Sequence, residues 1–205
     1  MINIATLDQA LATATKLHRL LRQEGLPEEA LHWPINDKCF RRKLVIFWKR
    51  QGDLSIPPFD TRRYVITVNY AGNKTIKNLL KEGKYDWVNS SITDRNFPTN
   101  KTGTEEDEIH LAHFHRRFDN EDLVIEELDK LGYKPVNSAQ LLALGAKYPD
   151  LQRQFPIVAL GQCWVDSRVR RFVVYLDGRS DDRHANLDWR EDEWHGDWRV
   201  AVVCK

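Results

Sequence analysis

Side chains suited to ligand recognition are concentrated in one segment near the C-terminus, residues 183–198. Tryptophan offers a large, rigid contact surface, and Asn, Asp and Arg add directional hydrogen bonds, so this mixture favours a recognition surface. The segment lies in an acidic part of the chain, because residues 177–197 hold eight Asp or Glu and three Arg. The candidate ligand-binding residues are Arg183, Asn186, Asp188, Trp189, Asp192, Trp194, His195 and Trp198. The alternative is that the indoles are buried in the core and the charges form a solvated loop.

Three histidines form a second candidate site, for a metal: His110, His113 and His115. Imidazoles close to the acidic run 105–108 could bind zinc and support a metal-dependent hydrolase. In a strand His113 and His115 share a face and His110 points the other way, so the spacing alone does not bring all three together. The helical metalloprotease pattern, two histidines with a glutamate between them, is absent. The alternative is a strand that carries surface histidines.

A basic segment supplies the third candidate, an interface for nucleic acid. Residues 37–63 hold eight Lys or Arg and three Asp or Glu. Phosphates are bound by clustered Lys and Arg, and unpaired bases stack on aromatic rings, which are also present here. The candidate residues are Arg41, Arg42, Lys43, Lys49, Arg50, Arg62 and Arg63. The alternative is that the apolar run 44–48 is a core strand whose basic flanks reach solvent.

Other catalytic patterns are absent from the sequence. It contains no phosphate-binding Walker loop, no dinucleotide glycine fingerprint and no Gly-x-Ser-x-Gly elbow. We therefore predict a non-catalytic module that binds a protein or a small ligand through residues 183–198, without a cofactor. A nucleic-acid-associated protein and a metal-dependent hydrolase remain as the alternatives.

Composition limits the class of protein. The chain has 205 residues, 41% of them hydrophobic, and a net charge of +1, which supports a sizeable core and excludes a chain that is basic overall. Its three cysteines are far apart, which argues against a disulfide scaffold and favours a reducing compartment. No apolar run approaches the roughly 20 residues that span a bilayer. The amphipathic N-terminal pattern differs from a signal peptide, so we expect a soluble, cytoplasmic protein without membrane contact.

Short helices and irregularly spaced strands must position these residues. Apolar spacing and glycine stops predict helices over 6–24, 75–82, 120–130 and 138–147. Apolar or alternating runs predict strands over 44–48, 64–70, 109–114, 156–160, 171–176 and 199–203. A turn is expected at Asp177-Gly178, and a polar loop over 89–104.

This order of elements indicates the α+β class, because regular alternation of strands and helices is missing. We expect short helices and an irregular, mostly antiparallel sheet. Residues 1–60 form an N-terminal helical and basic segment, and residues 61–205 form an α+β domain, although both could belong to one domain.

Two stretches carry a resemblance to known proteins. Gly132-Tyr-Lys-Pro-Val-Asn-Ser-Ala-Gln-Leu141 and Trp198-Arg-Val-Ala-Val-Val-Cys204 resemble a helix start and a closing strand of C-type-lectin-like domains, especially the formylglycine-generating-enzyme-like branch. That resemblance implies a lectin-like C-terminal third, with residues 183–198 on its ligand-binding face. Residues 64–205 also look like a group of bacterial proteins, many from candidate phyla, which share the Tyr85-Asp-Trp-Val-Asn89 and Phe155-Pro-Ile-Val-Ala-Leu-Gly161 stretches. This second likeness implies no particular activity.

Overall fold

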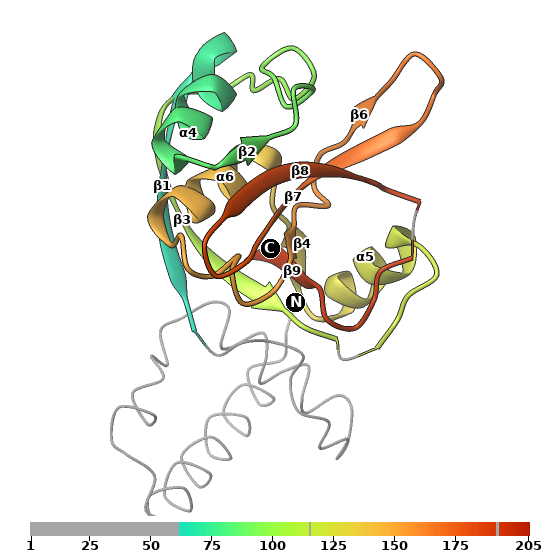
Figure 1. Cartoon of the computed structure of the whole chain (residues 1–205). Helices are drawn as coiled ribbons and strands as arrows, with labels where there is room; N and C mark the ends of the chain where they lie inside the picture. Colours follow the sequence, from blue (N-terminus) through green and yellow to red (C-terminus); the bar gives the residue numbers. More distant parts are fainter. Residues whose placement is uncertain (1–61, 115, 192) are drawn as a thin grey trace, which may run out of the picture. The chain divides into compact units, whose positions relative to one another are not determined.

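A computed structural model describes residues 62–114, 116–191 and 193–205. Three α-helices and nine strands lie in this described part, and the strands form a mixed, mostly antiparallel sheet (Figure 1). The expected α+β class is therefore confirmed. The predicted helix over 6–24 and strand over 44–48 lie outside the described residues. The lectin-like character of the C-terminal third stays a prediction.

The three helices begin and end close to the predicted positions. They are α4 (Thr75–Gly83), α5 (Glu121–Lys130) and α6 (Ser138–Lys147). Asn120 caps α5 by accepting a hydrogen bond from the backbone N–H of Leu123. Helix α6 starts with a capping box: Asn137 accepts from the N–H of Gln140, and the Gln140 side chain accepts from the N–H of Asn137. The cap of α6 is thus Asn137, directly before the first helical residue.

The long strands are β1 (Tyr64–Ala71), β3 (Thr102–Ala112), β7 (Arg171–Gly178), β8 (Arg183–Trp189) and β9 (Arg199–Cys204). The short strands are β2 (Trp87–Val88), β4 (Tyr133–Pro135), β5 (Ile157–Val158) and β6 (Trp164–Val165). The sheet runs in the order β1-β3-β9-β5-β7-β8-β2, with β4 beside β9 and β6 beside β7. Only β5 with β9 and β2 with β8 pair in parallel among these strands.

Two expectations for the strands were wrong. Strand β3 starts at Thr102, not at 109, because its polar first half pairs with all of β1. Asp177 and Gly178 do not form the turn after β7, because the ladder with β8 continues to the pair of Gly178 with Arg183. The reversal falls on residues 179–182.

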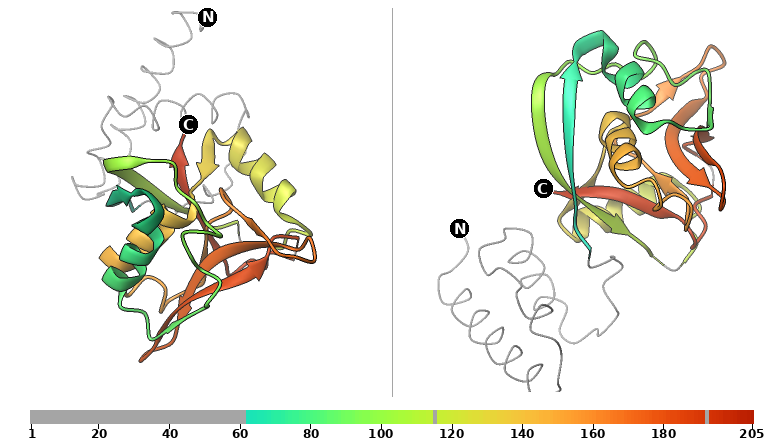
Figure 2. Two further views of the ribbon diagram at one scale, coloured as in Figure 1. Left: turned by 90° about the horizontal axis from the view of Figure 1, so that it is seen from above. Right: turned by 60° about the vertical axis from the view of Figure 1, so that its left-hand side comes forward.

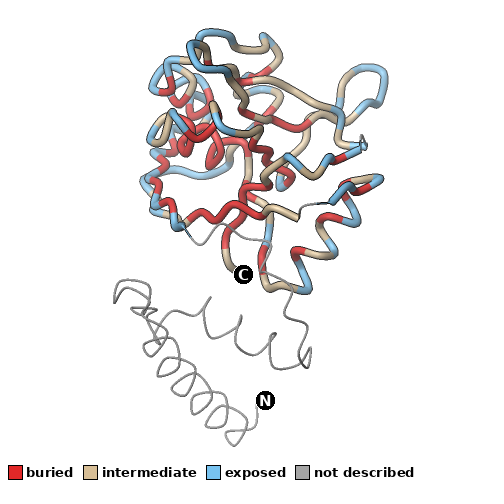
Figure 3. The backbone as a smooth tube through the Cα atoms, turned by 60° about the horizontal axis from the view of Figure 1, so that its bottom comes forward, coloured by how far each residue is buried: buried red, intermediate tan, exposed pale blue. Residues whose placement is uncertain are grey.

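Helix α6 is the centre of the hydrophobic core. Its residues from Ser138 to Gly145 are all buried, because α4 and the sheet surround it. Figure 2 shows α4 and α6 side by side at one end of the sheet and α5 at the other end. In Figure 3 the buried segments run through the interior of this body, and exposed segments lie mainly at loops and strand edges.

Candidate functional site

The first half of the candidate segment 183–198 is a strand and not a loop. Strand β8 lies between β7 and β2 (Figure 1), so its side chains alternate between the two faces of the sheet. Ala185 is fully buried in the main core together with Val174 and Leu176 of β7. His184, Asn186 and Asp188 therefore belong to the opposite face.

A row of hydrogen-bonded side chains crosses this opposite face. Asn89 donates from Nδ2 to Oδ1 of Asn186 at 3.1 Å, and Asn186 donates from Nδ2 to the hydroxyl of Tyr175 at 3.0 Å. The rings of Tyr175 and Trp198 lie 5.1 Å apart. All four side chains are half-buried, so the row is fixed in place and still reaches solvent. Such a row presents polarised amide groups in a fixed direction.

A second row, next to the first, combines an indole, an imidazole and two carboxylates. Trp87 is 48% exposed, and its ring lies 6.2 Å from that of His184. His184 has Nδ1 3.6 Å from Oδ1 of Asp177 and Nε2 3.2 Å from Oδ2 of Asp182. Asp188 adds a further carboxylate beside the first row, opposite Val173. We call these residues the acidic aromatic face: Trp87, Asn89, Tyr175, Asp177, Asp182, His184, Asn186, Asp188 and Trp198.

Burial and nearby carboxylates raise the pKa of two groups on this face. Burial is the main cause that raises the pKa of Asp177; the neighbouring carboxylate of Asp182 adds to the rise, and His184 opposes it. Burial also raises the pKa of Tyr175, with contributions from Asp177 and Asp188. A cation placed over the face would relieve this repulsion between carboxylates.

The raised pKa of Asp177 leads to a prediction for stability. A carboxyl group whose pKa is higher in the folded state disfavours folding once the pH exceeds that pKa. Asp177→Asn should therefore raise the free energy of unfolding at pH ~7 by a few tenths of a kcal/mol to about 1 kcal/mol. Below pH ~3, where the carboxyl is protonated in both states, the gain should vanish. Urea unfolding at the two pH values measures this, with the exposed Asp181→Asn as the control; an equal gain at both would contradict it.

Two of the predicted ligand-binding residues are buried, and their expected role is corrected. Trp194 is only 3% exposed, because its backbone bridges to Phe118 and its ring packs against Trp198. Arg183 is 7% exposed, because its guanidinium turns toward the helices α4 and α6. Both side chains support the face from within the protein.

The remaining candidates of the segment are divided. Asn186, Asp188 and Trp198 lie on the acidic aromatic face, as described above. Trp189 is 48% exposed but lies on the other face, where it is 6.5 Å from the ring of Phe172. His195 is exposed in the loop before β9. Asp192 lies outside the described residues.

Of the three histidines predicted as metal ligands, the structure describes His110 and His113, and each has its own partner. His110 is buried, with Nε2 3.1 Å from a carboxylate oxygen of Glu108, and His113 has Nε2 2.5 Å from the carbonyl oxygen of Gly196. Within residues 62–114, 116–191 and 193–205, no group of three or more His, Cys, Asp or Glu could hold a metal ion. His110 lies in β3 and His113 follows the end of that strand, and the two imidazoles contact different groups. His115 lies outside the described residues.

The basic segment is described only at its end. Arg62 and Arg63 are exposed just before β1, and Arg63 lies 3.6 Å from a carboxylate oxygen of Glu108. The other candidates for nucleic-acid binding, Arg41, Arg42, Lys43, Lys49 and Arg50, lie outside the described residues. The nucleic-acid interface therefore stays a prediction.

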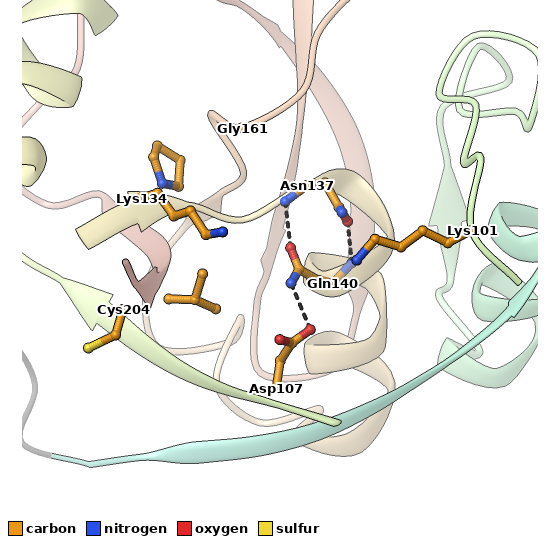
Figure 4. Close-up of a pocket in the computed structure, with 9 residues that line it drawn as sticks. Lys101, Asp107, Lys134, Asn137, Gln140, Gly161 and Cys204 are labelled. Carbon is orange, nitrogen blue, oxygen red and sulfur yellow. Dashed lines mark hydrogen bonds between the residues drawn. The ribbon is translucent and has the colours of Figure 1, made fainter. Parts of the chain in front are cut away.

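A hollow of about 300 Å³ lies at the start of α6 (Figure 4), and none of its lining residues belongs to the acidic aromatic face. Gln140 stands in it between Asn137 and Asp107, and donates from Nε2 to Asp107 at 2.7 Å. Lys101, on its rim, pairs with Glu105 at 2.5 Å. The capping box of α6 and Asp107 therefore form one wall of this hollow.

Six residues of the face are not among the candidates from the sequence: Trp87, Asn89, Tyr175, Asp177, Asp182 and His184. Trp87 lies in β2 and Asn89 directly follows it, about a hundred positions before β8, and both join β8 only through parallel pairing. Alternation along 171–178 could have identified Tyr175 and Asp177 as neighbours on one face of β7.

Comparisons with known proteins find no relative of this chain. No protein-family model, no curated protein and no solved structure matches the chain. A search of the described residues for a helix long and apolar enough to cross a membrane finds none.

Proposed function

We propose that this chain is a non-catalytic binding module whose acidic aromatic face recognises an arginine- or lysine-bearing segment of a partner protein. One observation carries the proposal: a half-exposed indole, an Asn–Asn–Tyr row and carboxylates share one face of the sheet. The C-terminal third resembles lectin-like domains, and this resemblance implies that residues 183–198 lie on a ligand-binding face. That expectation agrees with the proposal.

Each group has a defined part in such recognition. Trp87 offers a flat ring on which a guanidinium or an aliphatic stem can stack. Asp177 and Asp188 offer charge-assisted hydrogen bonds, which are stronger than neutral ones. The Asn89–Asn186–Tyr175 row is held in place before binding, so little side-chain entropy is lost when a ligand arrives.

The chemistry of the face favours recognition over catalysis. His184 contacts Trp87, Asp177 and Asp182, and within the described residues none of these contacts is the Ser, Thr, Cys or Lys that a histidine base would activate. The face therefore supplies area, charge and hydrogen bonds, which are the requirements of binding.

The test compares two tryptophans with the same exposure on opposite faces of the sheet. An arginine-rich peptide should bind the full chain in isothermal titration calorimetry, and binding should weaken as salt is added. Trp87→Ala should weaken this binding at least about tenfold, corresponding to the loss of one central contact of about 1–2 kcal/mol. Trp189→Ala is the matched control, because Trp189 is also 48% exposed, and should leave the affinity within about twofold.

Two outcomes would contradict the proposal. One is that the glutamate counterpart of the peptide binds as well as the arginine peptide. The other is that both tryptophan variants lose binding equally, which would place the contact elsewhere. Asn186→Ala separates the row from the indole, and a loss of affinity without a change in the salt dependence is expected for it, since an amide carries no charge.

A further inference from the structure

Strand β1 forms one edge of the sheet, and its own sequence has none of the residues that usually block edge pairing. The sheet order begins at β1, whose only strand neighbour in the described part is β3. Its sequence, Tyr-Val-Ile-Thr-Val-Asn-Tyr-Ala, has no charged residue, no proline and no glycine. Edge strands are usually protected by such residues, by bulges or by being short. This edge is eight residues long and regular in its pairing.

The direction of the backbone groups in β1 follows from the bonds of β9. The N–H of Arg199 donates to the carbonyl of Pro156, and the carbonyl of Ala201 accepts from the N–H of Val136. The backbone N–H and C=O groups of odd-numbered residues in β9 therefore point away from β3. Even-numbered residues of β9 then bond to β3, in the pairs of His110 with Val202 and of Ala112 with Val200.

The alternation continues across β3. The backbone N–H and C=O groups of its odd-numbered residues point toward β1. There they bond to the backbone groups of Tyr64, Ile66, Val68 and Tyr70. The N–H and C=O groups of Val65, Thr67, Asn69 and Ala71 therefore point outward, away from the sheet.

Side chains satisfy the two ends of this outward edge and confirm its direction. The hydroxyl of Tyr148 donates to the carbonyl of Val65 at 3.0 Å. The N–H of Ala71 donates to Oγ1 of Thr75 at 2.9 Å. Thr67 and Asn69, between them, are exposed, and their outward backbone groups have no partner in the described part of the chain.

We propose that β1 of a second copy of this chain pairs with β1 in antiparallel orientation. In this register Thr67 lies opposite Asn69 of the second copy, and the two Val68 residues face each other across the two-fold axis. Four backbone hydrogen bonds then form, because each Thr67–Asn69 pair exchanges two. The two sheets join into one continuous sheet through a self-complementary contact, which is the commonest form of protein dimer.

The satisfied ends select this register. With Thr67 opposite Asn69, Val65 lies opposite Ala71 of the second copy. The carbonyl of Val65 and the N–H of Ala71 would bond to each other, and these two groups are already satisfied by Tyr148 and Thr75. In any shifted register, the carbonyl of Val65 or the N–H of Ala71 would lie opposite a backbone group that has no partner yet. That backbone group would then lack a hydrogen bond in the dimer.

Side chains at the seam favour a neutral partner such as the same strand. Val65, Thr67, Asn69 and Ala71 alternate along the exposed side of β1 and carry no charge. Neighbouring residues across the two-fold axis would be Thr67 and Asn69, which can hydrogen-bond, and no like charges would face each other within the strand pair.

The full chain should show a weak, concentration-dependent dimer in sedimentation velocity, with dissociation in the high micromolar range, as expected for a small contact. Thr67→Pro should raise the dissociation constant at least about tenfold, because it removes an outward N–H and no bond to β3. Trp87→Ala, at the opposite edge of the sheet, is the control and should leave the dimer unchanged.

Hydrogen exchange keeps the proposal testable if the proline variant folds poorly. In the wild-type chain the amides of Thr67 and Asn69 should exchange more slowly as concentration rises, whereas those of Ile66 and Val68 should be protected throughout. Thr67→Lys should abolish the concentration dependence, since it places charge at the seam. A wild-type chain that stays monomeric at all concentrations, or dimerises without protecting Thr67 and Asn69, overturns the proposal.

Discussion

Replacing Arg183 by methionine should lower the free energy of unfolding by about 3–5 kcal/mol. The guanidinium is buried and donates to the carbonyls of Gly83 at 2.7 Å and Gly145 at 2.6 Å, and to Oε1 of Gln152 at 3.1 Å. These carbonyls lie at the C-terminal ends of α4 and α6, where helix dipoles favour a cation. The ring of Tyr85, whose centroid is 5.0 Å from the guanidinium carbon, adds a cation–π contact. Methionine fills similar space but leaves all three acceptors without their donor.

Chemical denaturation followed by circular dichroism measures this loss. Arg168→Met is the control, since Arg168 is exposed, and should change stability by less than about 0.5 kcal/mol. Arg183→Lys keeps the charge but not the fork of donors, so it should fall between the two. A change below about 1 kcal/mol for Arg183→Met would show that the buried cation costs as much as it contributes.

The helices and the class of fold were predictable because their signals are local. Apolar spacing with a cap and a stop is contained within each helix, as in α5 with Asn120 and in α6 with Asn137. Strand β8 also had a local signal, since His184, Asn186 and Asp188 alternate with apolar residues. The many charges around this strand are equally typical of a solvated loop, so its alternation alone does not identify it.

The buried positions of the candidate site were not predictable for a physical reason. Arg183 is buried only because two helices end beside it, at Gly83 and Gly145, which are far away in the sequence. Trp87 reaches the face only through parallel pairing with β8, and no local pattern specifies that pairing. Residue type indicated which side chains can recognise a ligand, and tertiary structure decided which of them are presented.

Tertiary structure also decides the role of Trp194, which is buried and not presented to a ligand. Trp194→Ala should lower the free energy of unfolding by about 3–5 kcal/mol, as for other buried aromatic residues. The indole is 3% exposed, lies 5.1 Å from the ring of Trp198, and belongs to a bridge in which Trp194 and Phe118 exchange two backbone hydrogen bonds of 2.9 Å. Removing it leaves a cavity beneath Trp198, and so beneath one end of the acidic aromatic face.

Trp194→Phe separates packing from polarity. The Nε1 group of Trp194 is buried and makes no hydrogen bond with any residue that the structure describes, so phenylalanine keeps most of the packing and removes this donor. It should therefore cost about 1 kcal/mol or less, because the smaller ring and the lost donor have opposite effects. Urea unfolding of both variants, with peptide titration of the folded protein, tests the assignment. If Trp194→Ala left stability unchanged and abolished peptide binding, the indole would be a surface contact and not the support of the face.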